Sequence, residues 1–215
     1  MIVKGLRSGL LTSIVLLGGC SSNSFNQTQI QPAVATIKPP VTQSSTWQQR
    51  QAFLAKKTSW QLKSKSSLRF DEEIFTFGLN WAQSPANNYV VNINNPVTGA
   101  LVSKLTRNNG VITLLADDGK TYRDTDEERL LKTQSGLSIP VKGLQYWVRG
   151  LTSPDYKVDK LLLDNAGRPN TIEQSGWKIK YSSYVNNGTN ALPRKIDLSR
   201  EKEKIFIRLI AKNWQ

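Results

Sequence analysis

Few side chains in this sequence could do chemistry, and one common catalytic type is missing. The chain of 215 residues has no histidine and a single cysteine, Cys20. Nucleophile arrangements such as Ser-His-Asp or Cys-His need an imidazole base, and His/Cys zinc sites need several such ligands. The sequence therefore excludes these enzymes, these metal sites and any internal disulfide, and we expect no cofactor.

Carboxylates are the remaining candidates for catalysis, for example as the two acids of a cell-wall glycosidase. Three groups of acids stand out: Asp71–Glu73 at a strand entrance, Asp117–Asp118 in a turn and Asp124–Glu128 at a helix start. Turns and helix caps account for all three groups. We therefore expect a protein that is not an enzyme.

Cys20 ends an N-terminal segment with the pattern of a secretion signal. Lys4 and Arg7 precede an apolar stretch, residues 9–17, that is too short to span a bilayer. Leu17-Gly18-Gly19-Cys20 resembles the lipobox of bacterial lipoproteins, which implies cleavage before Cys20 and acylation of that cysteine. Ser21 after it is similar to an outer-membrane sorting signal. An ordinary signal peptide that ends near a cysteine is the alternative.

The segment after Cys20 is polar and then basic. Residues 21 to about 44 contain Pro, Thr, Ser and Gln without apolar periodicity, which indicates a flexible tether. Every charged residue between Cys20 and Phe70 is basic, and the whole chain carries a net charge of +13. A basic face suggests anionic lipid headgroups or an acidic partner, and no nucleic acid is expected for an exported chain. A merely solvated basic face is the alternative.

The rest of the chain predicts a mainly antiparallel β fold. A helix is expected from Thr46 to about Lys57, with Trp47, Leu54 and Ala55 on one stripe. Alternating apolar residues and turn signals then predict short strands joined by tight turns, which favour a meander that curls into a barrel or half-barrel. The expected strands include Trp60–Leu62, Phe75–Trp81, Tyr89–Ile93, Val111–Leu115 and Lys120–Tyr122 around the turn Asp117–Gly119, then Lys160–Asp164, Thr171–Gln174, Trp177–Tyr184, Arg194–Leu198 and Ile205–Ala211.

Two amphipathic helices interrupt the predicted meander. The first is expected to start at a capping box at Thr125 and to stop at Gly136. The second is expected to run from Pro140 to Gly150. Each needs an apolar surface, and the concave side of a curved sheet supplies one, so we expect them to cover it as a lid.

Five stretches resemble the family of the outer-membrane lipoprotein receptor LolB, and together they cover most of the expected domain. They are Leu17–Cys20, Asn95–Gly99, Pro140–Leu151, Gly176–Tyr181 and Ile207–Trp214. The resemblance implies an unclosed antiparallel half-barrel with a helical lid and an apolar cavity over residues 45–215. It also implies a signal peptide at residues 1–19, and an acylated N-terminus with a linker at residues 20–44.

The resemblance further implies a monomeric receptor anchored by lipid to the periplasmic face of the outer membrane. It would accept acylated lipoproteins from the periplasmic carrier LolA and deliver them into outer-membrane lipid. Exposing acyl chains costs roughly 0.8 kcal/mol per methylene, so cargo cannot diffuse freely through water. A general lipid-binding or assembly-scaffold lipoprotein with the same fold is the alternative.

The family match also implies site residues. Trp81, Trp147, Trp177 and Trp214 match positions whose tryptophans face the cavity, with core packing as the alternative reading. Leu144 is also expected to line the acyl-chain cavity, and it and Val148 are expected in the lid, whereas Phe75, Phe77 and Leu79 are expected to be core. Val97 matches an apolar loop residue that projects into solvent and places cargo into the bilayer, with a normal turn in which Val97 is tucked inward as the alternative. Thr98 makes this loop one residue longer than the family's, which leaves open which residue is at the tip.

Overall fold

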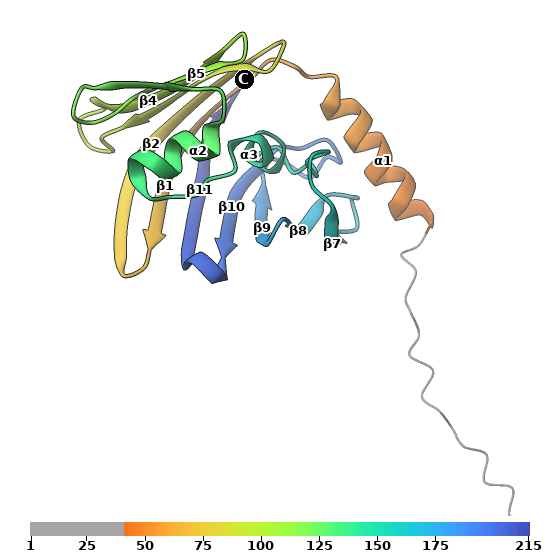
Figure 1. Ribbon diagram of the computed structural model, residues 1–215. Coiled ribbons are helices and arrows are strands. Elements are labelled where there is room, and N and C mark those ends of the chain that lie inside the picture. Colours follow the sequence, from red (N-terminus) through yellow and green to blue (C-terminus); the bar gives the residue numbers. More distant parts are fainter. Residues whose placement is uncertain (1–40) are drawn as a thin grey trace, which may run out of the picture. The chain divides into compact units, whose positions relative to one another are not determined.

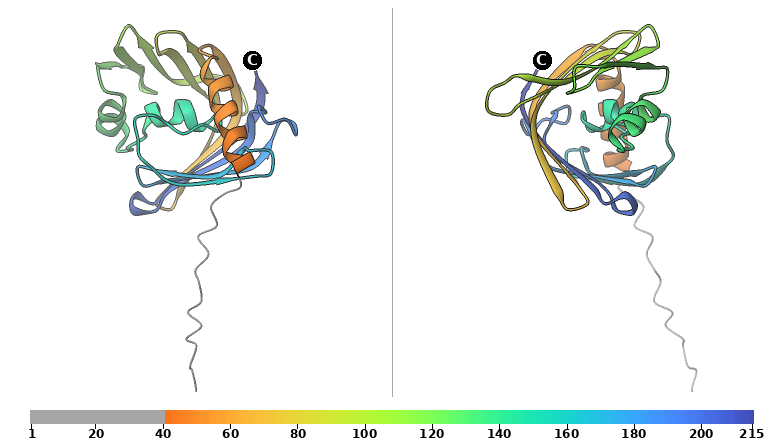
Figure 2. Two further views of the ribbon diagram at one scale, coloured as in Figure 1. Left: turned by 90° about the vertical axis from the view of Figure 1, so that its right-hand side faces the viewer. Right: turned by 60° about the vertical axis from the view of Figure 1, so that its left-hand side comes forward.

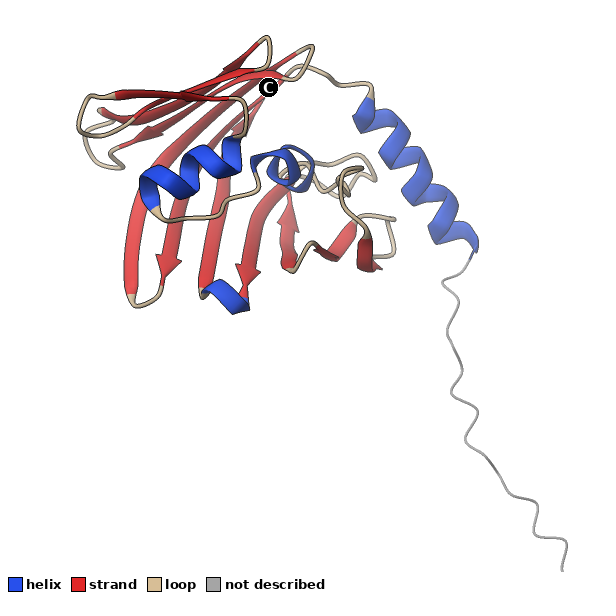
Figure 3. Ribbon diagram, in the orientation of Figure 1, coloured by secondary structure: helices blue, strands red, loops and turns tan. Residues whose placement is uncertain are grey.

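The structure, a computed structural model, describes residues 41–215, and its body is one antiparallel sheet of eleven strands (Figures 1 and 3). The predicted signal segment and Cys20 lie outside the described residues. The strands are β1 (Trp60–Phe70), β2 (Glu73–Ser84), β3 (Asn88–Asn94), β4 (Leu101–Asn108), β5 (Val111–Leu115), β6 (Thr121–Asp124), β7 (Val158–Leu163), β8 (Pro169–Gln174), β9 (Trp177–Tyr184), β10 (Pro193–Arg200) and β11 (Ile205–Trp214).

The sheet is a meander with a central seam. Its order is β6-β5-β4-β3-β2-β1-β11-β10-β9-β8-β7, so strands that follow one another in sequence are neighbours everywhere except for β6 and β7. β1 pairs with β11 at the centre, and the connection from β6 to β7 joins the two edge strands without pairing them. The predicted unclosed half-barrel is therefore confirmed, and Figure 2 shows the sheet curving around the helices.

Alternating burial explains why these segments form strands with one face on a core. In β1, Trp60, Leu62, Ser64 and Ser66 are buried while the residues between them are exposed. The predicted turn at Asp117–Gly119 is also present. Gly119 has a positive φ of 78°, and its amide donates to the Ala116 carbonyl, which closes the hairpin between β5 and β6.

The predicted helices are present, with shifted starts. Helix α2 (Glu127–Ser135) is capped by Asp126, whose carboxylate accepts from the Arg129 amide at 2.7 Å, and it ends at Gly136 in the left-handed conformation. The predicted start at Thr125 is wrong because the aspartate, not the threonine, caps the free amides. Helix α1 (Val41–Ala55) begins before the predicted Thr46, so residues 41–44, which we assigned to the linker, are helical.

Helix α3 (Val141–Trp147) ends in a motif that explains the role of Gly150. The Gly150 amide donates to the Trp147 carbonyl at 3.0 Å, and the Leu151 amide donates to the Tyr146 carbonyl at 3.1 Å. This pair of bonds is a Schellman motif, which requires a left-handed residue, and Gly150 has a φ of 68°. The predicted end of this segment at Gly150 therefore has a physical cause.

Two buried arginines join helix α1 to helix α3. From α1, Arg50 is fully buried and donates to the carbonyls of Arg149 (2.9 Å) and Gly150 (3.4 Å) at the end of α3. From the turn that ends α3, Arg149 donates to the carbonyls of Leu54 and Lys57 at the end of α1, both at 3.1 Å. Each guanidinium thus donates to carbonyls at or just beyond the C-terminus of the other helix, where backbone carbonyls lack intrahelical partners and the helix dipole favours a cation. We call this arrangement the arginine clamp.

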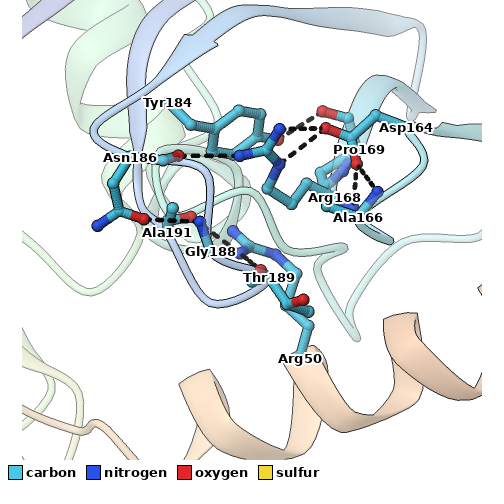
Figure 4. A network of polar contacts seen from close by, with 10 residues as sticks. All are labelled: Arg50, Asp164, Ala166, Arg168, Pro169, Tyr184, Asn186, Gly188, Thr189 and Ala191. Carbon is cyan, nitrogen blue, oxygen red and sulfur yellow. Dashed lines mark hydrogen bonds and ion pairs between the residues drawn. The ribbon is translucent and has the colours of Figure 1, made fainter.

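Arg50 also ties the clamp to the β9–β10 connection (Figure 4). Its Nη1 donates to the carbonyls of Thr189 at 2.5 Å and Ala191 at 2.9 Å. Beside it, the Tyr184 ring lies 5.6 Å from the Arg50 guanidinium and 4.5 Å from that of Arg168. Burial lowers the pKa of Arg50, and the carbonyl oxygens around it compensate its charge.

Candidate functional site: an apolar cavity and an exposed loop

A cavity of about 310 Å³ lies between the concave face of the sheet and the segment that carries α2 and α3. Strands β1 to β5 and β11 form its wall, and the helical segment forms its cover. It is lined by Leu68, Phe75, Phe77, Leu79, Trp81, Val91, Ile93, Ser103, Leu105, Leu114, Leu131, Ser135, Leu137, Ile139, Val141, Leu144, Val148, Ile207 and Leu209.

The cavity lining is almost wholly hydrocarbon. Its two polar side chains are Ser103 and Ser135, and their hydroxyls donate to the carbonyls of Leu115 at 2.9 Å and Leu131 at 2.8 Å. Neither hydroxyl proton is therefore directed at a ligand. A cavity without polar partners does not hold water well but accepts apolar molecules. The arrangement fits a hydrocarbon chain and offers no group for acid–base chemistry.

Strand β2 contributes most of one wall through alternate residues. Phe75, Phe77, Leu79 and Trp81 all line the cavity, as their shared strand face predicts. The expectation that Phe75, Phe77 and Leu79 belong to the closed core is wrong. Phe75 is 48% exposed, so this wall continues from the cavity to the protein surface.

The structure brings together only some of the predicted cavity residues. Trp81 and Leu144 line the cavity, and so does Val148. Trp147 and Trp177 do not: they are buried with ring centroids 6.2 Å apart, and the Trp147 indole donates to Gln174 at 2.9 Å. These two tryptophans therefore pack in the core, as the alternative reading of the sequence proposes.

Trp214 also lies away from the cavity. Its indole donates to the Pro193 carbonyl at 2.9 Å, and its ring lies 5.9 Å from that of Trp60. The period of a strand tells which face a side chain takes, but not whether that face meets a void or a helix. Near Trp147 and Trp177, helix α3 fills the concave side, and the cavity lies over the other half of the sheet.

Several lining residues were not singled out from the sequence. They are Leu68, Val91, Ile93, Leu105, Leu114, Leu131, Leu137, Ile139, Val141, Ile207 and Leu209. Their only signal is the ordinary apolar periodicity of strands and helices, which lining and core residues share. The strand β4 that carries Leu105 was itself not predicted, because its sequence alternates poorly between apolar and polar residues.

Glu127 connects the start of helix α2 to the sheet. Its buried carboxylate accepts from the Arg107 guanidinium at 2.5 Å and from the Tyr89 hydroxyl at 3.2 Å. Burial and the neighbouring Glu127 charge raise the pKa of Tyr89 well above its usual range, so this hydroxyl remains a donor. One end of the cavity cover is thus fixed to β3 and β4.

Val97 lies on the β3–β4 loop and is 91% exposed. The loop is held by its own hydrogen bonds: the Asn95 carboxamide oxygen accepts from the amides of Val97 at 2.9 Å and Thr98 at 3.1 Å. The Gly99 amide donates to the Asn95 carbonyl at 2.9 Å, and Gly99 has a φ of 76°. The alternative in which Val97 is tucked inward does not hold. The loop presents an isolated apolar side chain on a preformed turn.

Two further properties bear on the chemistry of the described part of the chain. Within residues 41–215, no three His, Cys, Asp or Glu side chains gather where they could hold a metal ion. The helices in this part are all too short or too polar to span a lipid bilayer.

Two solved structures share this fold at low sequence identity. An outer membrane lipoprotein-sorting protein domain of Vibrio parahaemolyticus aligns with a TM-score of 0.55 at 10% identity, over 80% of this chain and 90% of the other. A DUF1329 family protein of Desulfovibrio piger aligns with a TM-score of 0.53 at 8% identity, over 80% and 92% of the two chains. These likenesses concern the fold alone.

Sequence comparison identifies the family. Proteins named outer-membrane lipoprotein LolB are similar over most of the chain. The protein of Nitrosococcus oceani is 33% identical over 96% of this chain and 95% of its own length, and that of Alkalilimnicola ehrlichii is 30% identical over 85% and 90%. The family model described as outer membrane lipoprotein LolB matches residues 58–214, which hold the curved sheet, the cavity and the Val97 loop. The chain therefore belongs to the LolB family of outer membrane lipoproteins.

Proposed function

We propose that this chain is a receptor that accepts acylated lipoproteins from the soluble periplasmic carrier LolA and inserts them into the outer membrane. The observation that carries the proposal is the apolar cavity of about 310 Å³ under a helical cover, in a chain of the LolB family. The proposed protein is a monomer and not an enzyme. It is held on the periplasmic face by acylation of Cys20, after removal of residues 1–19, and residues 20–40, before helix α1, act as its linker.

The cavity is too small for acylated cargo unless the helices that cover it move. A cavity of about 150 Å³ holds one benzene molecule, so about 310 Å³ holds roughly a dozen carbon atoms, less than one long acyl chain. Acylated cargo therefore needs more space than the closed form offers. Leu131, Val141 and Leu144 belong to the cover and contact the cavity, so displacement of α2 and α3 would enlarge it with apolar surface on all sides.

Transfer of cargo tests the proposal directly. The full acylated chain is reconstituted in vesicles, a radiolabelled lipoprotein is supplied on purified carrier, and the label that reaches the vesicles is measured. We expect transfer without any nucleotide, because acyl chains move between apolar surfaces. A folded chain that takes up no label contradicts the receptor function. In cells, depletion of a receptor leaves lipoproteins on the carrier, whereas depletion of a scaffold lipoprotein leaves sorting intact.

A substitution of Val97 tests delivery into the bilayer separately from uptake of cargo from the carrier. We expect Val97→Glu to fold normally and to take cargo from the carrier, while delivery into the bilayer falls about tenfold or more. A charged side chain enters hydrocarbon at a cost of a few kcal/mol, and about 1.4 kcal/mol already corresponds to tenfold. Val111→Glu is the matched control, because Val111 is also an exposed valine, at the start of β5. Wild-type delivery by Val97→Glu would remove this loop from the mechanism.

A further inference from the structure

Five basic side chains gather on the outer face of the sheet, where β1, β11 and β10 lie side by side. Lys65 on β1 and Lys195 on β10 both pair in register with Ile210 of β11, so the three side chains form one row across the strands. Lys63, Arg194 and Lys212 lie one step further along the same strands. We call Lys63, Lys65, Arg194, Lys195 and Lys212 the outer basic cluster.

Irregularities in strand pairing lie within this cluster. Between β1 and β11, Lys63 pairs with Asn213 and Ser64 with Ala211, which leaves Lys212 as an extra residue. Between β10 and β9, Arg194 is skipped in the same way, between Pro193 and Lys195. A bulge turns a side chain away from the regular alternation and is typical of functional positions. Both bulged cations line one surface groove of about 590 Å³.

The charge of the outer basic cluster is not compensated within the described residues. None of its members forms an ion pair in residues 41–215. The nearest acid along β10, Asp197, is already bound by the Arg208 guanidinium at 2.7 and 2.8 Å. Like charges on adjacent strands repel one another, so the cluster favours an anionic partner.

Apolar side chains lie among these cations. Ile210 is 41% exposed and Val185 is 47% exposed, and both line the groove together with Arg194, Lys212 and Trp214. Aromatic and aliphatic groups beside lysines suit the interface of a bilayer, where phosphates and the ends of acyl chains lie at nearly the same depth. Four of the five cations are lysines, which act as point charges and do not require the paired geometry of a specific carboxylate.

We propose that the outer basic cluster docks on the phosphate-bearing headgroups of anionic lipids in the membrane that carries the chain. This inference rests on the proposed membrane anchoring. The cavity lies on the opposite face of the same sheet, so a chain docked in this way presents its cavity away from the membrane, toward an arriving carrier. Delivery through the Val97 loop is then a separate contact with the bilayer.

Lysine footprinting tests this docking on the full chain. The acylated chain is reconstituted in vesicles of phosphatidylcholine alone, or of phosphatidylcholine mixed with phosphatidylglycerol. It is treated with a membrane-impermeant acetylating reagent, and mass spectrometry reports the rate at each lysine. We expect Lys63, Lys65, Lys195 and Lys212 to react about fivefold more slowly on the anionic vesicles, the factor that corresponds to about 1 kcal/mol per basic residue.

Internal controls separate docking from general effects. Lys120 and Lys204, in turns away from the cluster and paired with Asp118 and Asp71, should react equally on both vesicles. High salt should abolish the protection, because it screens exposed charges. Inorganic phosphate added to phosphatidylcholine vesicles should give no protection, which identifies lipid headgroups as the source of the phosphate.

A double variant provides the matched comparison. With Lys65→Gln and Lys212→Gln together, the remaining protection of Lys63 and Lys195 should fall to near zero, whereas Lys120→Gln with Lys160→Gln should leave it unchanged. Equal rates on both vesicles for the wild-type chain overturn the proposal. Protection that appears only when purified carrier is added overturns it too, and assigns the cluster to an acidic protein. The intact mass reports acylation of Cys20, so a failure of anchoring is seen separately from a failure of docking.

Discussion

Asp124 is one residue whose charge holds a functional element in place. It lies just before helix α2 and accepts from the amides of Thr125 at 2.6 Å and Asp126 at 3.0 Å. It also forms an ion pair with Arg129 on the first turn of the helix. The hydrogen bonds from the Arg129 side chain, followed by those from the two amides, lower the pKa of Asp124 to about 2.

This shift predicts a stability change in acid. Because the pKa of Asp124 is lower in the folded chain than its ordinary 3.8, its contribution is present above about pH 4 and is lost as the pH falls toward 2. We expect Asp124→Asn to lose less unfolding free energy than the wild type over that interval, measured by urea unfolding at a series of pH values. The control is Asp159→Asn, which removes an exposed acid on β7 and should leave the fall in unfolding free energy with pH as in the wild type. If the unfolding free energy of Asp124→Asn falls with pH as steeply as that of the wild type, the stability change does not come from Asp124.

Among the elements, the cavity cover formed by α2 and α3 is held at its two ends by different means. Its start is the first residue of α2, Glu127, which binds Arg107 and Tyr89. Its end is fixed to α1 by the arginine clamp. A cover that opens to admit acyl chains must therefore either release the clamp or move while α1 follows. The clamp makes α1 part of the machinery of the cavity cover, although α1 does not line the cavity.

The clamp predicts a large effect of one substitution. Arg50→Met leaves four carbonyls without a donor, and each buried unpaired group costs about 1–3 kcal/mol. We expect the free energy of unfolding to fall by about 3 kcal/mol or more. Hydrogen exchange should accelerate in α1 and α3 more than in α2. Gln51→Ala is the control on the same helix, because Gln51 makes one partly buried bond to Thr152 and should cost less than about 1 kcal/mol. Equal acceleration in all three helices would contradict a specific coupling of α1 to α3.

For the molecule as a whole, the sequence predicts the architecture better than the site. Period-two patterns, the turn at Asp117–Gly119 and the stop at Gly136 are local signals, and the structure has the corresponding strands, hairpin and helix end. The curved open sheet and its cover then follow from the need to bury one face of each element. Strand β4 was missed because its burial pattern, unlike that of β1, hardly alternates.

The position of the cavity could not be predicted, because it depends on which part of the concave face α3 leaves empty. Trp147 and Trp177 share the inward orientation of Trp81, yet only Trp81 meets the void. The outer basic cluster could not be predicted from the sequence either. Lys65 and Lys195 are far apart in the chain and come close only because both β1 and β10 pair with β11. By contrast, the Asn-Pro and Gly of the Val97 loop are local signals of a turn, and the resemblance to the LolB family, not the turn itself, implies that Val97 projects.

The central seam between β1 and β11 has a consequence for biogenesis. Most neighbouring strands are joined by short turns, but Leu62 must find Trp214 across nearly the whole folded domain. Pairs so distant in sequence form late and slowly during folding. Until β11 has been synthesised, no strand pairing joins the two halves of the sheet, and we expect the chain to stay in a form that can still be threaded through a secretion channel.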